Sequence, residues 1–262
     1  MYHELRKRGA RVPHVLIIAR SILFNVLFYL TILIYLAVAL PTFLMPYWAI
    51  VELAKVWART NLWLLRTICG IDVEFAGLDK IPPDPLIVAA KHQSFWETFA
   101  LLLVFSRPTY IVKRELMWIP LFGWFMWKGR MVPVDRGARR QALTAMTRRA
   151  REELRRGRQI IIFPEGTRRQ PGAPPAYKSG IAHLYAETGV PCVPVALNSG
   201  LYWGRRSLKR YPGTIRVEIL DPIPPGLDKN TFLQRLEHDI ETATARLVAA
   251  AAPPQAEPQG SG

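Results

Sequence analysis

The chain has 262 residues, 50% of them hydrophobic and 21% charged, which suits one large domain or two small ones with a substantial core. Its formal net charge of +15 favours an anionic partner, either nucleic acid or an anionic membrane. The two cysteines, Cys69 and Cys192, exclude a disulfide framework or a cysteine zinc site and suit a reducing compartment. No His, Asp and Glu cluster has metal-ligand spacing, so we predict no metal.

The first feature along the chain is an uncharged stretch over residues 21–51. A membrane helix needs about 20 apolar residues, and residues 21–40 reach that length before Pro41 interrupts them. A second apolar piece over 42–57 carries tyrosine and tryptophan, which suit a membrane interface. We therefore predict an N-terminal hydrophobic two-helix membrane anchor over residues 1–69. Its first helix is expected at about 15–40 and a second, interfacial or re-entrant helix at about 42–68.

The orientation of this anchor follows from the charges before it. Five basic residues precede or open the span against Glu4 alone, which places the N-terminus in the cytosol: Arg6, Lys7, Arg8, Arg11 and Arg20. A cleaved signal peptide is an alternative, because "AVA" at 37–39 resembles a cleavage site, but the apolar run exceeds the usual 7–15 residues. A full crossing and a re-entrant pair of helices remain open from the anchor sequence alone.

From Gly70 onwards, short apolar runs alternate with helical patterns, which is typical of α/β proteins. Strands are expected at 72–76, 86–90, 109–113, 131–134, 159–163, 192–197 and 214–219, and helices at 95–105, 138–156, 179–188 and 229–250. Several of these strands are apolar throughout, as in a sheet covered on both faces. We predict an α/β domain over 70–250, built on a mixed, mostly buried sheet flanked by helices, and a disordered tail over 251–262.

The expected strand 86–90 runs out into "KHQSFWET", which brings His92 and Glu97 close together in the sequence. On a continuous helix, positions i and i+5 point about 140° apart, but a strand-to-helix junction relaxes that constraint. The pair could therefore be a base and the acid that orients it. The alternative is a capping box, in which Ser94 caps a helix and Glu97 occupies its third position.

Several cationic groups follow in segments that suit phosphate binding. The string "FPEGTRR" ends a strand, and within it Gly166 permits close backbone approach while Thr167 and Arg168 offer donors. Lys178 precedes an expected helix start, which is another favourable place for an anion. Lys113, Asp135 and Arg136 surround the aromatic segment between them. An apolar wall, a cationic clamp and a histidine base together predict a site for a phosphate-bearing lipid.

These residues resemble the 1-acyl-sn-glycerol-3-phosphate acyltransferases of the glycerolipid acyltransferase superfamily, over about residues 70–220. The first family motif, His-x4-Asp, matches His92 to Glu97, with glutamate in place of the usual aspartate. The second resembles Lys113, Phe122-Gly123 and Asp135-Arg136. The third, Phe-Pro-Glu-Gly-Thr-Arg at 163–168, is unaltered, and the fourth resembles Val193-Pro194-Val195. The departure in the first motif keeps the charge but puts the identity of the acceptor in doubt.

The resemblance implies acyl transfer from acyl-CoA or acyl-carrier protein, with no other cofactor, to the sn-2 hydroxyl of lysophosphatidic acid, which yields phosphatidic acid. His92 would act as general base and Glu97 would hold its tautomer. Arg168 would bind the acceptor phosphate, helped by three further cations, Lys113, Arg136 and Lys178. Gly166 and Thr167 would line that loop. Glu165 would bond the glycerol hydroxyl or orient Arg168.

Three alternatives stay open at this point. Arg136 could pair with Asp135 instead of binding phosphate. The acceptor could be another lyso-lipid, such as a lyso-ornithine lipid or lysophosphatidylcholine. A non-enzymatic, membrane-tethered binder of anionic lipid or nucleic acid is also conceivable, although no nucleic-acid motif is present and we predict no nucleic-acid partner.

Two residues other than His92 could in principle supply a nucleophile. Cys192 lies within an apolar strand pattern, where a core thiol is the commoner case, and Ser94 is better explained as a helix cap. We expect neither to act. A CoA-dependent enzyme has to face the cytosol, so we predict a membrane protein whose catalytic domain lies on the cytoplasmic side, at the inner membrane in a bacterium. The oligomeric state is not predicted.

Overall fold

The computed structural model describes residues 13–83, 85–135 and 139–251. The expected cytosolic cluster at Arg6, Lys7, Arg8 and Arg11, the predicted phosphate ligand Arg136 and the tail beyond Ala251 lie outside the described residues.

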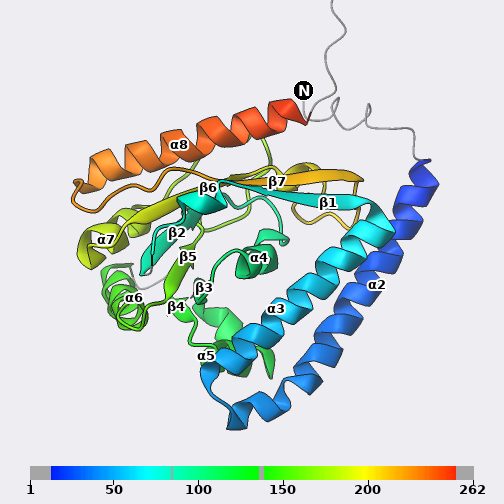
Figure 1. Cartoon of the computed structure of the whole chain (residues 1–262), viewed down its shortest axis with the longest axis horizontal. Coiled ribbons are helices and arrows are strands. Elements are labelled where there is room, and N and C mark those ends of the chain that lie inside the picture. Colours follow the sequence, from blue (N-terminus) through cyan, green and yellow to red (C-terminus); the bar gives the residue numbers. More distant parts are fainter. Residues whose placement is uncertain (1–12, 84, 136–138, 252–262) are drawn as a thin grey trace, which may run out of the picture.

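A seven-stranded sheet forms the centre of the molecule, in the order β1-β7-β6-β2-β5-β3-β4 (Figure 1). Neighbouring strands are parallel except for β6 and β7, so the sheet is mixed, as predicted. Every predicted strand is present to within one residue at either end: β1 (Ile71–Ala76), β2 (Leu86–Ala90), β3 (Pro108–Lys113), β4 (Val132–Val134), β5 (Gln159–Ile162), β6 (Cys192–Leu197) and β7 (Gly213–Ile219). All residues of β2, β5 and β6 are buried because helices cover both faces of the sheet there.

Helices α6 (Arg139–Leu154), α7 (Ser179–Thr188) and α8 (Lys229–Ala250) cover one face of the sheet (Figure 1). Helix α4 (Glu97–Ala100) lies against the other. The helix predicted over 95–105 is shorter than expected. It starts at Glu97, because the preceding residues are held by side-chain hydrogen bonds, and it tightens into the 3-10 turn Leu101–Leu103.

The N-terminal region forms a helical hairpin, with α2 (His14–Val38) and α3 (Tyr47–Leu64) packed against each other (Figure 1). A 3-10 turn, Leu40–Leu44, begins at the predicted break, and Pro46 caps α3. A π-helical turn, Leu65–Cys69, then carries the chain to Gly70, whose positive φ of 66° ends the helix. Among the described residues, one segment, His14–Leu44, is long and apolar enough to cross a membrane by length and composition.

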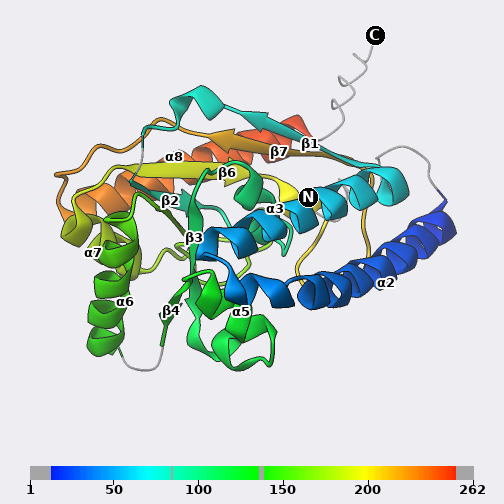
Figure 2. The same ribbon diagram turned by 60° about the horizontal axis from the view of Figure 1, so that its bottom comes forward.

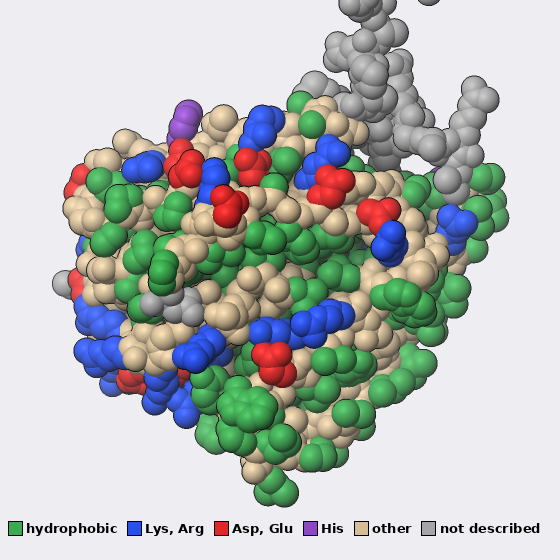
Figure 3. Space-filling view, in the orientation of Figure 1, with side chains coloured by type: hydrophobic (Ala, Val, Ile, Leu, Met, Phe, Trp, Pro, Cys, Tyr) green, Lys and Arg blue, Asp and Glu red, His purple; other side chains and the backbone are tan. Residues whose placement is uncertain are grey.

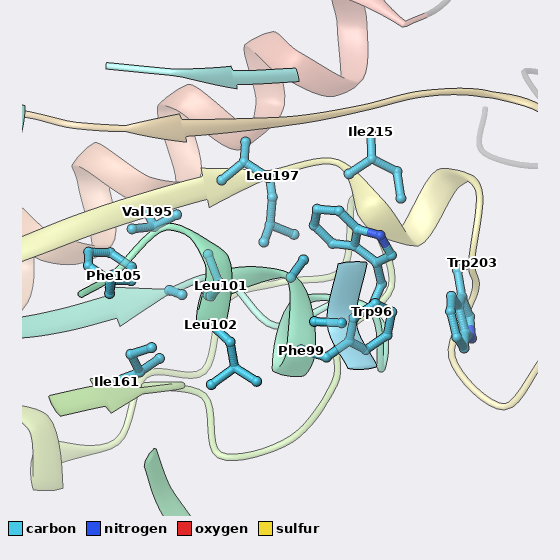
Figure 4. Close-up of a cluster of buried hydrophobic side chains, with 14 of the residues drawn as sticks. Trp96, Phe99, Leu101, Leu102, Phe105, Ile161, Val195, Leu197, Trp203 and Ile215 are labelled. Atoms are coloured by element: carbon cyan, nitrogen blue, oxygen red, sulfur yellow. The ribbon is translucent and has the colours of Figure 1, made fainter. Parts of the chain in front are cut away.

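An aromatic cluster fixes this hairpin to the sheet. Phe24 and Phe28 of α2 pack around Trp203, and Phe28 also contacts Phe95 and Phe99 near α4. The same core continues from Trp96 and Phe99 to the buried strands β5 and β6 (Figure 4). Each buried aromatic side chain contributes roughly 1.5–3 kcal/mol by leaving water, so the loop between β2 and α4 rests on a rigid base.

The segment between β3 and β4 contains two helical turns that the sequence analysis did not predict. They are a 3-10 turn (η5, Arg114–Trp118) and a short helix, α5 (Phe122–Lys128). A side chain at Gly123 would collide with the backbone carbonyl of Met117, so glycine allows the two turns to pack closely.

Candidate active site

Five adjacent strands, β6, β2, β5, β3 and β4, run parallel, so their carboxyl ends share one edge of the sheet. The loops that leave this edge carry His92 after β2, the 163–168 turn after β5 and Lys113 at the end of β3. Such an edge is the usual place for ligands in open α/β sheets. The fold therefore brings the first and third sequence motifs together on neighbouring strands.

His92 Nδ1 lies 2.9 Å from Glu97 Oε1, and the Glu97 side chain is fully buried. If the imidazole is neutral, a hydrogen bond to an ionised carboxylate requires the proton on Nδ1. The Nε2 lone pair then remains available, and no described residue hydrogen-bonds to Nε2. The predicted proximity of the two side chains is present at the strand-to-helix junction, as the relaxed geometry requires.

Four further donors surround the Glu97 carboxylate. The backbone N–H groups of Gln93 and Ser94 donate to Oε1, while the hydroxyls of Ser94 and Ser199 donate to Oε2 at 2.7 and 2.8 Å. Burial by itself would raise the pKa of Glu97, but the hydrogen bonds from His92 and Ser94 outweigh it and lower that pKa below its ordinary value. Glu97 is therefore held as an anion.

The predicted capping box is present only in part. Helix α4 begins at Glu97, with Trp96 rather than Ser94 at its N-cap and no side-chain cap. Glu97 does accept a hydrogen bond from the backbone N–H of Ser94, and Ser94 Oγ accepts one from the backbone N–H of Trp96. The same carboxylate thus holds the turn before α4 and contacts the imidazole.

Phe163, the first residue of the third motif, stacks on the His92 ring with a centroid distance of 4.0 Å and an interplanar angle of 17°. The backbone N–H of Arg169 donates to the His92 carbonyl at 2.8 Å. The imidazole is therefore held on one side by a carboxylate, on its face by an aromatic ring and at its backbone by the neighbouring loop. This leaves little freedom to rotate, which suits a positioned base.

A buried charge cluster lies beside this pair. Lys91 Nζ is 3.1 Å from Glu165 Oε1 and 2.6 Å from Glu241 Oε1 of α8, and Tyr177 donates to the same Glu241 oxygen. Arg169 Nε approaches Glu165 at 3.7 Å. Burial raises the pKa of Glu165, and the Lys91 ammonium opposes that rise. Glu165 Oε2 is buried without a partner among the described residues.

The structure places the predicted phosphate ligands around the same edge but does not bring them into one cluster. Gly166 has the left-handed φ of 65° that its turn requires. The side chains of Lys113, Arg168 and Lys178 form no ion pair or hydrogen bond with described residues, and Thr167 is exposed. Such uncommitted cations are free to meet an anion from solution.

The structure bears on two of the alternatives that the sequence left open, the partner of Asp135 and the partner of Glu165. Asp135, the expected partner for Arg136, forms an ion pair with Arg114 at 2.9 Å, and Arg136 itself lies outside the described residues. The cationic neighbours of Glu165 are Lys91 and Arg169, and no contact with Arg168 is present.

Sequence reasoning missed several residues that complete the site. Lys91 directly precedes His92, and this position next to an expected base was a signal in the sequence. Its burial, which is rare for a lysine unless the ammonium is paired, is visible only in the structure. Ser199 and Glu241 carry no local signal, because they come from the 3-10 turn after β6 (Ser199–Leu201) and from α8. Only the order of the strands reveals them.

The alternative nucleophiles are inaccessible. Cys192 is fully buried within β6, and burial raises the pKa of its thiol well above the ordinary value. Ser94 is also fully buried, with its hydroxyl committed to Glu97. In the described part of the chain, no three or more His, Cys, Asp and Glu side chains are grouped to hold a metal ion.

A cavity of about 360 Å³ lies elsewhere, bordered by Tyr47, Ser106, Arg107 and Arg158 among others. Arg107 and Arg158 directly precede β3 and β5, so this cavity is at the amino-terminal edge of the sheet. It is at the opposite end of those strands from His92.

The chain is similar to known acyltransferases. The family model described as Acyltransferase matches residues 72–198. The chain is 39% identical over 163 residues to the 1-acyl-sn-glycerol-3-phosphate acyltransferase of Pseudomonas aeruginosa, covering 62% of this chain and 63% of that relative. This match thus spans less than two thirds of the relative's own length. The human 1-acyl-sn-glycerol-3-phosphate acyltransferase alpha is 30% identical over 191 residues, covering 70% and 68%.

A solved structure shares the fold as well. The crystal structure of the 1-acyl-sn-glycerophosphate acyltransferase PlsC from Thermotoga maritima superimposes with a TM-score of 0.73 at 25% identity. The superposition covers 88% of this chain and 97% of the other. The resemblance seen in the motifs therefore extends through the fold, and the chain belongs to the 1-acyl-sn-glycerol-3-phosphate acyltransferase family.

Proposed function

We propose that the protein transfers an acyl chain from acyl-CoA or acyl-carrier protein to the sn-2 hydroxyl of lysophosphatidic acid, which forms phosphatidic acid. The observation that carries this proposal is the His92 imidazole, fixed at Nδ1 by a buried anion, with Nε2 free at the carboxyl edge of the sheet. Family membership supports the reaction class, and the geometry of the site supports the role of the base.

In the proposed reaction, Nε2 of His92 accepts the proton of the sn-2 hydroxyl while its oxygen attacks the thioester carbonyl. This attack forms the new carbon–oxygen bond and a tetrahedral intermediate. Its collapse restores the carbonyl and breaks the carbon–sulfur bond, and the departing thiolate takes the proton from Nε2. Glu97 stabilises the imidazolium between these two steps, and because the substrate supplies the attacking oxygen, no covalent enzyme intermediate is required.

The acceptor phosphate would be bound by the uncommitted cations on the same edge. Arg168 follows the turn that contains Phe163, and Phe163 stacks on the base, so a phosphate bound there would lie near the reacting hydroxyl. Lys113 and Lys178 are exposed and available as helpers. Arg136 keeps the same proposed role. Glu165 Oε2, buried without a partner, is a candidate acceptor for a glycerol hydroxyl.

The helical hairpin is the proposed membrane anchor, with both ends on the cytoplasmic side. Two groups of contacts, one polar and one aromatic, support a position of the hairpin within one leaflet. Asn25, midway along α2, bonds to Arg210 and to the backbone of Leu208, and Phe24 and Phe28 pack into the domain. A helix joined side-on to a polar domain over residues 21–28 is not surrounded by lipid on all sides there. This packing favours the re-entrant arrangement over a full crossing.

An acyl-acceptor assay with the purified full chain tests this function. Lysophosphatidic acid, a lyso-ornithine lipid and lysophosphatidylcholine would each be offered with acyl-CoA and with acyl-carrier protein. We expect turnover with lysophosphatidic acid, reduced by about 10²- to 10⁴-fold in His92→Ala because the general base is lost. Wild-type turnover in His92→Ala would end the base hypothesis. A preference for a phosphate-free acceptor would move the protein to another lyso-lipid.

A further inference from the structure

The segment between β3 and β4 exposes more large apolar side chains than a soluble surface requires. Trp127 is 71% exposed and Trp118 67%. Six exposed apolar residues fall within the ten positions 118–127: Trp118, Ile119, Leu121, Phe122, Trp124 and Trp127. Single exposed apolar residues are ordinary, but a contiguous group marks a surface that meets another apolar body. We call these six residues the α5 patch.

The α5 patch is joined to the turn of the N-terminal hairpin. Lys128 Nζ donates to the Phe43 carbonyl at 3.1 Å, and the rings of Phe43 and Phe125 lie 4.8 Å apart. The Arg130 guanidinium covers the Tyr47 ring at 4.9 Å. In Figure 2, α5 lies directly beside the end of α2 and the turn that follows it. The two segments, some 80 residues apart in sequence, are therefore joined by direct contacts.

The hairpin turn next to the patch is itself apolar and exposed. Leu44 is 95% exposed, and Leu40, Met45 and Trp48 are also exposed. Figure 3 shows hydrophobic side chains gathered along the lower and right-hand border of the molecule, over α2, α3 and α5. The patch thus continues the apolar surface of the proposed anchor and does not form an isolated spot.

Basic residues border the patch on the side of the sheet. Lys113, Arg114 and Arg130 are exposed around it, and the Arg114 guanidinium lies 5.7 Å from the centre of the Trp118 ring. Glu115 is the single acidic residue within 114–128. Tryptophan flanked by arginine and lysine is the composition that lies at the boundary between hydrocarbon and anionic headgroups.

We propose that the α5 patch is a second membrane-contacting element, which enters the same leaflet as the helical hairpin. This inference rests on the proposed membrane function of the hairpin and adds a contact that the apolar N-terminal sequence does not reveal. Segment 114–128 leaves the carboxyl end of β3 at Lys113 and runs back to the amino-terminal end of β4, because these two strands are parallel. Contact at both the hairpin turn and α5 would fix the height and tilt of the sheet on the membrane, and so set the level of the His92 imidazole relative to the headgroups.

Matched substitutions in the full chain test the proposal. The triple variant Trp118→Ser, Trp124→Ser and Trp127→Ser removes the apolar contact, whereas Trp118→Leu, Trp124→Leu and Trp127→Leu preserves it without the indoles. Leu78→Ser, an exposed leucine between β1 and β2, is the control away from the patch. Vesicles of phosphatidylethanolamine and phosphatidylglycerol, with and without brominated acyl chains, are the probe.

We expect brominated chains to quench part of the wild-type tryptophan fluorescence, and the serine variant to lose much of that quenchable part. The serine variant should also partition into vesicles about tenfold less, while the leucine variant and Leu78→Ser stay within about twofold of wild type. Unchanged quenching and partitioning in the serine variant would overturn the proposal. Wild-type dimerisation abolished by the serine variant, without any change in quenching, would assign the patch to a second copy of the chain and also overturn it.

The ratio of turnover on vesicle-embedded acceptor to turnover on micellar acceptor separates this proposal from the proposed function. We expect that ratio to fall at least fivefold in the serine variant. An absence of turnover in wild type would defeat the proposed function and leave the quenching test intact. Circular dichroism of each variant before and after heating checks that the substituted chain is folded.

Discussion

Two regions depart from the usual rule that charged side chains are exposed and large apolar ones buried. They are the loop after β2 and the surface formed by the hairpin turn and α5. The loop buries Lys91 and Glu97, whereas the surface leaves Leu44 and Trp127 in contact with solvent. Each departure costs free energy unless a partner compensates for it. In the loop the partners are other residues of the chain, since five hydrogen bonds reach the Glu97 carboxylate. On the surface the described residues leave these apolar groups exposed, and the proposed partner is the membrane.

The largest effect is expected from removing the buried negative charge of Glu97 in the loop after β2. Glu97→Gln keeps the shape of the side chain but replaces an anion by an amide, whose NH₂ group faces donors instead of accepting from them. We expect turnover to fall by about 10³-fold, equivalent to ~4 kcal/mol of barrier, because the imidazole loses both its tautomer and its counter-charge. Steady-state kinetics with lysophosphatidic acid measure it.

Ser94→Ala is the matched control for Glu97→Gln. It removes the hydroxyl that accepts a hydrogen bond from the backbone N–H of Trp96 and donates one to Glu97, but it leaves the carboxylate and the imidazole in place. A loss of about 1 kcal/mol of stability with turnover retained within tenfold is expected. Full activity in Glu97→Gln would show that the carboxylate serves only as a helix cap.

The next effect concerns Lys91, the single ammonium between two carboxylates. Lys91→Met removes the nearer of the two cations beside Glu165 and leaves Arg169 at 3.7 Å, and breaking a buried ion pair costs about 3 kcal/mol. The raised pKa of Glu165 should rise further in this variant. Folding then takes up a proton at Glu165, so stability is progressively lost as pH increases from about 4.5, the ordinary value, towards that raised pKa. Thermal unfolding at pH 5 and pH 8 should show the greater loss at pH 8.

Lys80→Met is the control for Lys91→Met. Lys80 pairs with Asp221 at the surface, where an ion pair contributes about 0–1 kcal/mol. Its removal should change the melting temperature little, and equally at both pH values. An equal loss at pH 5 and pH 8 in Lys91→Met would refute the coupling to Glu165.

The smallest effect is expected at the uncommitted cations, because each is one of several that could bind the same phosphate. Arg168→Ala should raise the apparent KM for lysophosphatidic acid by about tenfold and change the KM for the thioester less. Arg148→Ala, which removes an exposed arginine of α6 on the other face of the sheet, is the matched control and should change neither constant. A selective rise in the thioester constant would assign Arg168 to the donor site.

Much of the fold could be predicted from the chain because its signals are local. Strands β2, β5 and β6 are buried runs, β1 and β7 alternate along their length, and the ends of all seven strands were located to within one residue. The break between the two N-terminal helices follows from Pro41 and Pro46, which cannot continue a helix. By contrast, α5 was missed, because it is short and three of its four aromatic residues are exposed, which leaves Phe125 alone to indicate a buried face.

The candidate site divides in the same way. His92, Glu97 and the 163–168 turn are recognisable because each motif is short and continuous in the sequence. The tertiary structure alone decided the partners of these residues, since Lys91 meets Glu165 and Glu241 across 74 and 150 residues of chain. Likewise Ser199 reaches Glu97 across 102 residues. Local propensity and spacing determine which elements form, whereas the parallel order of β6, β2 and β5 determines which side chains share an edge.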